Sequence, residues 1–451
     1  MSDNDFIQPS PHAGQFQSSI GIRFDRLRAE ARACLLVAKD VLETPPEILA
    51  IESEPLPFEL LHGLRDVEQS ATDQSTRESL RTDLTAIATR LSQRLLASSN
   101  FSKEPSIADS LLAIGIHGDG IWHVEGKQAY AYRSMVNATR IAEQFGKTVV
   151  SGFPERDFAQ GGRGGPVESH GIWLLLADRA NRLDSTYRGC HWRGLVDVSR
   201  HATQFSIVGP IEQHLKTQPS PANDVCVGDQ LLAELVASFS SNSELTNSTP
   251  GSSSDSLAAS SSGSAPVDVG KVAAQGTPIL ELLEIWQATM SRDSSWNPHG
   301  MSALPLIYAW RNSIYATSPL KDLLATAIHL IALEIGSYVR HRIPAATPIG
   351  ELFFMGEGTT VDLIVHVLVD QLPGVAIRRL SELGQDRTLY ASAVAALVLL
   401  NLWQVPLPST KPGEVPRVLG RVTPGNPSNW RHVLRVMNSN APWLLPLREA
   451  I

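Results

Sequence analysis

Apolar positions in the first half of the chain form short continuous runs separated by segments of helical spacing. The run at 111–118 predicts a buried strand, and the segment 75–98 carries apolar residues every three or four positions, which predicts a helix. A glycine ends the helical pattern at 146. In chain order the predicted elements are strand 34–42, helix 75–98, strand 111–118, helix 137–146, strand 148–153 and antiparallel strands within 193–210.

The second half of the chain is more helical. Apolar periodicity predicts helices at 279–290, 320–342 and 361–372, with one strand at 349–358. A strand followed by a glycine-rich turn and a helix directs backbone N–H groups at a ligand, often a phosphate. We therefore expect one ligand-facing segment in each half, and a substrate in a cleft between two domains.

Two segments lack the pattern of a folded element. Residues 238–266 are dominated by serine and offer almost nothing large to bury, so they cannot offset the entropy lost on ordering. We predict a disordered insertion there. The proline-rich stretch 406–427 predicts a loop.

Length, charge and cysteine content restrict the class of protein. A chain of 451 residues predicts two domains, and a net charge of −8 argues against nucleic-acid and anionic-membrane partners. The three cysteines, Cys34, Cys190 and Cys226, have no CxxC spacing and indicate unpaired thiols. The N-terminus has no secretory pattern, and the longest apolar runs are shorter than the roughly 20 residues of a membrane span. We expect a soluble, cytoplasmic protein.

The stretch GIHGDGIWH at 115–123 concentrates polar residues at the end of a predicted strand. His117, Asp119 and His123 have the spacing H-x-D-x₃-H, which allows a metal site and a hydrolase built on it. The alternative is a substrate-facing loop in which the histidines contact a ligand or make structural hydrogen bonds. No further cluster of ligands with fitting spacing accompanies the three residues, so we predict no metal site.

The segment SGFPERDFAQGGRGGPVESHG at 151–171 resembles a strand, turn and G-G-Q-G-A-P-L loop of the anhydro-N-acetylmuramic acid kinases. The opening stretch is similar to the S-H-G-Q-T-x-x-H of that family, and IAEQFGKTVV at 141–150 is similar to I-A-E-x-T-G-x-x-V-V. In the second half, ELFFMGEGTTVDLIVHVLVDQLPG at 351–374 resembles the strand, G-G-G-A-x-N turn and helix of the family. The likeness runs in order from about residue 20 to about residue 435.

The resemblance implies an α/β fold of the two-domain actin, hexokinase and Hsp70 type, built from ribonuclease-H-like domains around an interdomain cleft. We expect the domain containing the sugar-binding loops at 20–237 and a helix-rich α/β domain with a nucleotide-facing glycine turn at 267–451. A disordered tail at 1–19 precedes them, and the insertion at 238–266 separates them.

The activity implied by the resemblance is ATP- and Mg²⁺-dependent phosphorylation of 1,6-anhydro-N-acetylmuramic acid, with cleavage of the anhydro ring, in peptidoglycan recycling. Asp157 matches the general base, which must lie within hydrogen-bond reach of the attacking water. The partners implied are an amino sugar and a nucleotide, with a homodimer as one candidate assembly. The matching substrate-binding positions are His117, Gly118, His123, Gly161, Gly162, Gly164 and Pro166, and the nucleotide-facing positions are Gly356, Gly358 and Gly228.

The chain departs from the family where phosphates would bind. The first phosphate loop, G-x-M-S-G-T-S-x-D-G, corresponds to IGIRFDRLRAEARA at 20–33, and arginine and leucine poorly replace glycines that must approach a phosphate closely. The D-T-G-P-G-N loop corresponds to DVCVGD at 224–229, and Glu357 stands within the glycine turn. The alternative is therefore an inactive pseudokinase that binds a sugar, a nucleotide or a protein partner.

Overall fold

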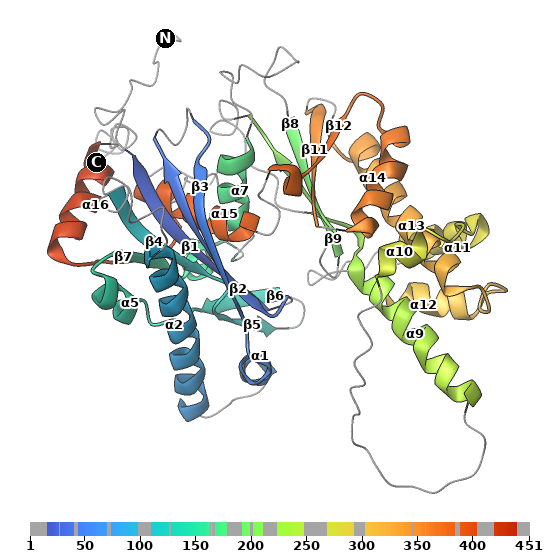
Figure 1. Cartoon of the computed structure of the whole chain (residues 1–451), viewed down its shortest axis with the longest axis horizontal. Helices are drawn as coiled ribbons and strands as arrows, with labels where there is room; N and C mark the ends of the chain where they lie inside the picture. Colours follow the sequence, from blue (N-terminus) through green and yellow to red (C-terminus); the bar gives the residue numbers. More distant parts are fainter. Residues whose placement is uncertain are drawn as a thin grey trace, which may run out of the picture. The chain divides into compact units, whose positions relative to one another are not determined.

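The computed structural model describes two compact units, shown in Figure 1. Unit 1 comprises Met1–Arg193, Ser206–Ala222 and Arg387–Ile451, and unit 2 comprises Gly194–Phe205 and Asn223–Asp386. Within them the structure describes residues 16–26, 28–39, 44–69, 74–97, 110–125, 128–162, 164, 167–177, 192–198, 202–210, 223–247, 268–292, 303–344, 347–356, 358–383, 388–403 and 419–439.

Unit 1 is built on a six-stranded sheet of order β13-β7-β4-β1-β2-β3. The first three strands form an antiparallel meander, and β4 and β7 extend the sheet in parallel from β1. β13 pairs antiparallel with β7 at the edge. The strands are β1 (Gln17–Asp25), β2 (Glu30–Ala38), β3 (Glu47–Pro55), β4 (Leu111–His117), β7 (Thr148–Ser151) and β13 (Arg421–Thr423), with a separate hairpin of β5 (Ile121–Glu125) and β6 (Gln128–Arg133).

Helices cover both faces of this sheet. Successive side chains of β1 point to opposite faces, and both sets must be buried. Ile20 and Ile22 are fully buried in one core cluster with Leu84 and Ile87 of α2. On the other face, Ser19 Oγ donates to the carbonyl oxygen of Ala395 at 2.8 Å. The helices of unit 1 are α1 (Phe58–Gln69), α2 (Gln74–Ala97), α5 (Ala138–Phe145), α6 (Phe153–Ala159), α7 (Glu168–Leu176), α15 (Leu389–Leu402) and α16 (Pro427–Ser439).

The central helix α15 packs on β1, β2 and β4 and against α7 (Figure 1). It is apolar around almost its whole circumference, as expected of a helix buried on all sides. Glycines allow the close approach: a Cβ at Gly21 would lie 2.1 Å from the carbonyl oxygen of Ala391, and one at Gly171 would lie 2.0 Å from that of Ala393. Since side chains cannot occupy that space, the packing of α15 requires these two glycines.

Unit 2 repeats the strand order of unit 1. Its sheet has the order β10-β9-β8-β11-β12, so in both units three successive strands are followed by two more on the other side of the first strand, and unit 1 adds β13 beyond them at its edge. This 3-2-1-4-5 order is that of ribonuclease-H-like domains, which confirms the predicted two-unit α/β fold. The strands are β8 (Trp192–Asp197), β9 (Ala202–Val208), β10 (Asn223–Val227), β11 (Ile349–Met355) and β12 (Ala376–Arg379).

Unit 2 is also rich in helices, as its apolar periodicity predicts. Among the described residues, α13 alone has the length and hydropathy to cross a membrane, and 61% of its most apolar stretch is buried inside the protein. That burial is typical of a core helix. The helices are α9 (Asp229–Asn247), α10 (Val269–Ala273), α11 (Leu280–Arg292), α12 (Leu304–Arg311), α13 (Leu320–His341) and α14 (Thr359–Gln371), with the 3₁₀ turn η1 (Leu380–Leu383).

The structure corrects the expected domain boundaries. Most of β8 and most of β9 precede the serine-rich segment yet belong to unit 2, whereas α15, β13 and α16 follow it and belong to unit 1. Sequence order failed here because the chain crosses between the units more than once. β13 also lies inside the stretch 406–427 that we predicted to be a loop.

Two segments that we predicted to be disordered have other boundaries in the structure than we expected. Residues 17–19 open β1 instead of belonging to a tail, because they pair with β2. Residues 238–247 continue α9, since the segment has no glycine or proline before Pro250 to end the helix. Residues 1–15 and 248–266 lie outside the described residues.

Candidate functional site

His117 ends β4 and is held by a buried charged cluster. Its Nε2 atom lies 3.0 Å from Oε1 of Glu168, and the same oxygen lies 3.0 Å from Nε of Arg23. Arg23 is the Cα partner of His117 across the parallel β1–β4 pair, while Glu168 comes from the first turn of α7. The carboxylate thus offsets the cost of burying the guanidinium and also orients the imidazole.

The second ring nitrogen of His117 is buried and has no hydrogen-bond partner in the described structure. The side chain is only 7% exposed, and the ring of Phe153 packs edge-on at a centroid distance of 6.1 Å. Because an unpaired buried polar atom is costly, Nδ1 is a natural contact for a ligand group.

Gly118 turns the chain directly after His117. It has a φ of 79°, and a Cβ there would lie 1.8 Å from Nη1 of Arg23. The position therefore requires glycine for its backbone conformation and also for the approach of the arginine.

Asp119 is a structural residue, which contradicts the metal-site alternative. One carboxylate oxygen accepts from Ser134 Oγ at 2.6 Å and from the backbone N–H groups of Met135 and Val136 at 3.0 and 2.9 Å. The other accepts from the hydroxyl of Tyr132 at 3.3 Å. These bonds tie the strand β4 to the end of β6, and no three metal-ligating side chains gather within the described part of the chain. Burial, followed by the charge of Asp119, raises the pKa of Tyr132 well above its usual value.

Asp157 lies on α6 and organises the glycine loop that follows. Its Oδ2 atom accepts a hydrogen bond from the backbone N–H of Gly164 at 2.7 Å. Its backbone carbonyl oxygen accepts one from the backbone N–H of Gly162 at 2.8 Å. A Cβ at Gly162 would lie 2.1 Å from the carboxylate. The loop is therefore wrapped tightly around a mostly buried acid.

The same loop packs against aromatic side chains. Gly164 has a φ of 80°, and a Cβ there would lie 2.3 Å from the ring of Phe158 and 2.9 Å from that of Trp122. Trp122 in turn packs on Tyr132 at a centroid distance of 4.8 Å. Gly161 also has a positive φ, but nothing lies near a Cβ built there. Pro166 lies outside the described residues.

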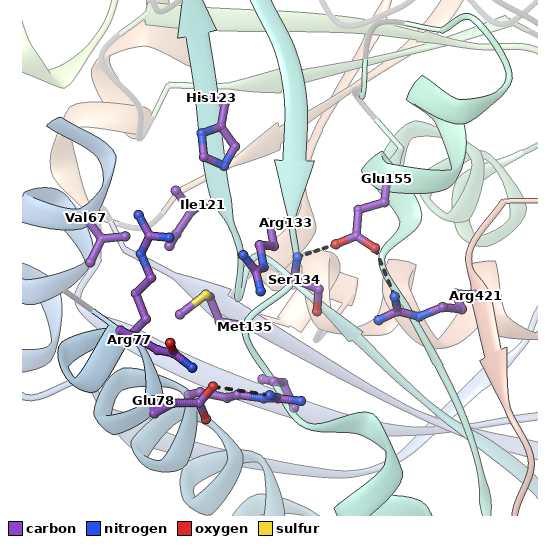
Figure 2. A pocket seen from close by; sticks show the side chains of 13 residues that line it. Val67, Arg77, Glu78, Ile121, His123, Arg133, Ser134, Met135, Glu155 and Arg421 are labelled. Atoms are coloured by element: carbon purple, nitrogen blue, oxygen red, sulfur yellow. Dashed lines mark hydrogen bonds and ion pairs between the residues drawn. The ribbon is translucent and has the colours of Figure 1, made fainter. Parts of the chain in front are cut away.

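His123 lies in different surroundings from His117. It is half-buried and lines a cavity of about 750 Å³ to which neither His117 nor Asp157 contributes (Figure 2). The ring of His117 instead contacts Phe153, at the start of the helix α6 that carries Asp157, and sugar contact by either histidine stays a prediction.

The glycine turn of unit 2 joins β11 to α14. Gly356 has a φ of 119°, and Gly358, the N-cap of α14, has a φ of 95° with open space around a Cβ built there. Gly228 connects β10 to α9 and is buried. Backbone can approach a phosphate at the Gly358 turn, in keeping with the nucleotide-facing role predicted for it. Glu357 lies outside the described residues.

The β1–β2 turn of unit 1 does not fit a phosphate cradle. It contains Arg26, whose guanidinium pairs with Glu68 at 2.7 Å and donates to the carbonyl oxygen of Gly120. Ala29 closes the turn with a φ of 51°, a conformation that favours glycine. Since the paired side chain of Arg26 occupies this turn, the turn leaves no glycine-lined cradle for the phosphates of ATP.

Sequence reasoning missed Arg23, Glu168 and Tyr132 as parts of the site. Glu168 had a detectable signal, because a lone acid directly after a glycine loop is unexpected in an otherwise apolar helix. Arg23 and Tyr132 had none, since each lies in an ordinary strand.

A family model and several curated relatives are similar to parts of this chain. The family model described as anhydro-N-acetylmuramic acid kinase matches residues 33–182. The anhydro-N-acetylmuramic acid kinase of Coxiella burnetii is 34% identical over 141 residues, which are 31% of this chain and 37% of that protein. The match thus spans little more than a third of that relative. The enzyme of the same name from Streptomyces avermitilis is 26% identical over 323 residues, covering 69% of this chain and 71% of the relative.

Solved structures give weaker likenesses. Component A of the (R)-2-hydroxyglutaryl-CoA dehydratase of Acidaminococcus fermentans has 11% identity and a TM-score of 0.37, covering 84% of this chain and 96% of its own. Xylulose kinase from Rhodospirillum rubrum has 10% identity and a TM-score of 0.36, covering 96% and 99%. Both scores are low, so the fold class rests on the repeated strand order of the two sheets.

Proposed function

Since the family model and the curated relatives support assignment of this chain to the anhydro-N-acetylmuramic acid kinase family, we propose that it is a sugar kinase acting on 1,6-anhydro-N-acetylmuramic acid. In this proposal ATP, with Mg²⁺, supplies the phosphoryl group, and the product is the 6-phosphosugar of peptidoglycan recycling. Its partners are the amino sugar and the nucleotide, a homodimer is one candidate assembly, and its location is cytoplasmic.

One observation carries the proposal: the buried carboxylate of Asp157 is fixed beside the glycine loop, within the segment that matches the family. The bond from Gly164 holds Oδ2, so the carboxylate is oriented before substrate arrives. The unpaired Nδ1 of His117 provides a second polar contact in the same unit.

Asp157 acts in this proposal as the general base. It would accept a proton from a water molecule whose oxygen forms a bond to the anhydro carbon as the bond from that carbon to O6 breaks, and the freed O6 would accept the γ-phosphoryl group of ATP as the bond to the leaving ADP breaks. A positioned base contributes typically 10²–10⁴-fold to such a step. Gly161, Gly162 and Gly164 shape the backbone that would face the sugar.

A second candidate function is supported by the β1–β2 turn. Arg23 and Arg26 pair with Glu168 and Glu68 where the family resemblance implies a glycine-lined phosphate loop. This arrangement favours an inactive pseudokinase that binds sugar through His117 without transferring phosphate. Gly356, Gly358 and Gly228 of unit 2 would then contact a nucleotide only as a ligand.

The decisive experiment incubates purified full-length protein with ATP, Mg²⁺ and anhydro-N-acetylmuramic acid, and follows ADP and the 6-phosphosugar by mass spectrometry. We expect Asp157→Asn to lower kcat about 10²–10⁴-fold. Because an amide oxygen still accepts from Gly164, we expect its melting temperature to change little. Asp83→Asn, which removes an exposed acid of α2, is the matched control and should keep full activity.

The outcomes separate the two candidate functions. Turnover lost in Asp157→Asn alone supports the kinase. Sugar binding by calorimetry without any turnover in the native protein supports the pseudokinase instead. Absence of both binding and turnover contradicts both.

A further inference from the structure

A basic cavity of about 750 Å³ lies in unit 1, between α2, the β5–β6 hairpin and α6 (Figure 2). Its charged and titratable lining consists of Arg77, Arg81, Arg133, Arg421, His123, Glu78 and Glu155. Four arginines against two glutamates give an excess of two positive charges, in a chain whose net charge is −8. Such a local reversal of sign favours an anionic ligand.

The two glutamates already have partners. Glu155 accepts from the backbone N–H of Ser134 at 2.5 Å and lies 3.4 Å from Nη1 of Arg421. Glu78 lies 3.6 Å from Nη1 of Arg81, one turn along α2. Each acid thus offsets one arginine at the rim of the cavity.

The other two arginines are left without a counter-charge. Neither Arg77 nor Arg133 has a side-chain ion pair or hydrogen bond in the described structure, and Nε of Arg77 is buried without a partner. Arg77 comes from α2 and Arg133 from the end of β6, so they approach the cavity from different elements (Figure 2). The unsatisfied buried Nε of Arg77 is costly and favours a ligand that accepts a hydrogen bond there, and the exposed Arg133 can add a second charged donor from across the cavity.

The remaining lining is largely apolar. Val67, Ile121, Met135 and Val136 form a surface against which a carbon-rich body can pack. A volume of about 750 Å³ is in the range of small-molecule sites. The cavity therefore combines room for a body the size of a hexose with two guanidinium groups.

We propose that this cavity binds a phosphate monoester of hexose size, and that Arg77 and Arg133 donate hydrogen bonds to its phosphate oxygens. A phosphate monoester carries a charge of about −1.5 to −2 at neutral pH, which matches the excess of two positive charges, whereas a carboxylate carries only −1. One guanidinium group can donate two parallel N–H···O hydrogen bonds to a phosphate. The site uses neither Asp157 nor His117, so it goes beyond the proposed kinase activity.

The test measures binding by isothermal titration calorimetry on the full chain. Glucose 6-phosphate is the probe, and glucuronate, glucose and inorganic phosphate are compared with it. We expect glucose 6-phosphate to bind at least tenfold more tightly than glucuronate, and its affinity to fall as salt is added. Arg77→Gln and Arg133→Gln should each weaken it about tenfold, the loss of one charge-assisted contact.

Arg140→Gln is the matched control, because Arg140 is an exposed arginine of α5 that does not line the cavity. It should bind glucose 6-phosphate as the native protein does. Circular dichroism of all three variants checks that they are folded. Equal binding of glucuronate, unchanged binding in both Arg77→Gln and Arg133→Gln, or no binding of glucose 6-phosphate to the native protein would each overturn the proposal.

Discussion

The two units share one strand order and differ in what fills their loops. In unit 1 side chains fill the space near the ends of β1 and β4: Arg23, His117 and Glu168 form a mostly buried cluster. In unit 2 the turn between β11 and α14 is open, and nothing lies near a Cβ built at Gly358. The same topology thus supports one site defined by side chains and another defined by backbone.

The two units show that glycines in this chain are required for two different physical reasons. Gly162 and Gly164 are required because Asp157 and Phe158 crowd them, whereas Gly358 is required only by its backbone conformation. Crowded glycines shape a specific loop around side chains. An open glycine leaves room for a ligand to reach the backbone.

The largest effect is expected from breaking the charged cluster of unit 1. Glu168→Ala leaves Arg23 and His117 mostly buried without their shared carboxylate, so we expect a loss of about 3–5 kcal/mol in the free energy of unfolding, measured by urea titration. Glu68→Ala is the control, because its pair with Arg26 is more exposed and should cost less than about 1 kcal/mol. Equal losses in the two variants would show that the cluster contributes no more than a surface pair.

A smaller effect is expected from the paired glycine variants Gly164→Ala and Gly358→Ala. Both place alanine at positive φ, which costs about 1–2 kcal/mol, and only Gly164→Ala adds a clash with Phe158, worth about 1–3 kcal/mol more. Thermal and urea unfolding of both variants measure the difference. If Gly358→Ala is the more destabilised variant, the turn at Gly358 is crowded and is not more open than the loop at Gly164.

The smallest effect concerns Glu334, a partly buried acid of unit 2. Burial raises the pKa of Glu334 above its usual value, and the amide of Gln287, 3.3 Å away, only partly opposes this. The folded protein therefore binds that proton more tightly than the unfolded chain, so the contribution of Glu334 to stability is fully present below pH 4.5, its unfolded pKa, and is lost as the pH rises through the raised pKa.

Glu334→Gln should remove this dependence. We expect the variant to gain melting temperature relative to the native protein as the pH increases from 4 to 8, with no gain at the acidic end. A difference in melting temperature that stays constant over this range would show that burial does not perturb Glu334.

Much of the fold could be predicted because helices and strands depend on local spacing. The predictions for 75–98, 137–146 and 320–342 are confirmed by α2, α5 and α13, and Gly146 ends α5 in the left-handed conformation as its position suggested. β1 was missed because its polar ends and its glycine at position 21 interrupt the apolar run. That glycine serves the packing of α15, which is about 370 residues away in the chain and which no local pattern reveals.

For the candidate site, the sequence by itself determined where the turns fall: the end of β4, the Asp157 loop and the Gly356–Gly358 turn all lie where glycines and polar residues follow apolar runs. Only the tertiary structure decided what each residue does. Four donors from β6 and the residues after it surround the carboxylate of Asp119, whereas Glu168 contacts one ring nitrogen of His117 and the other has no partner in the described structure. Such roles depend on contacts between residues distant in sequence, and those contacts exist only once the sheet and its helices have packed.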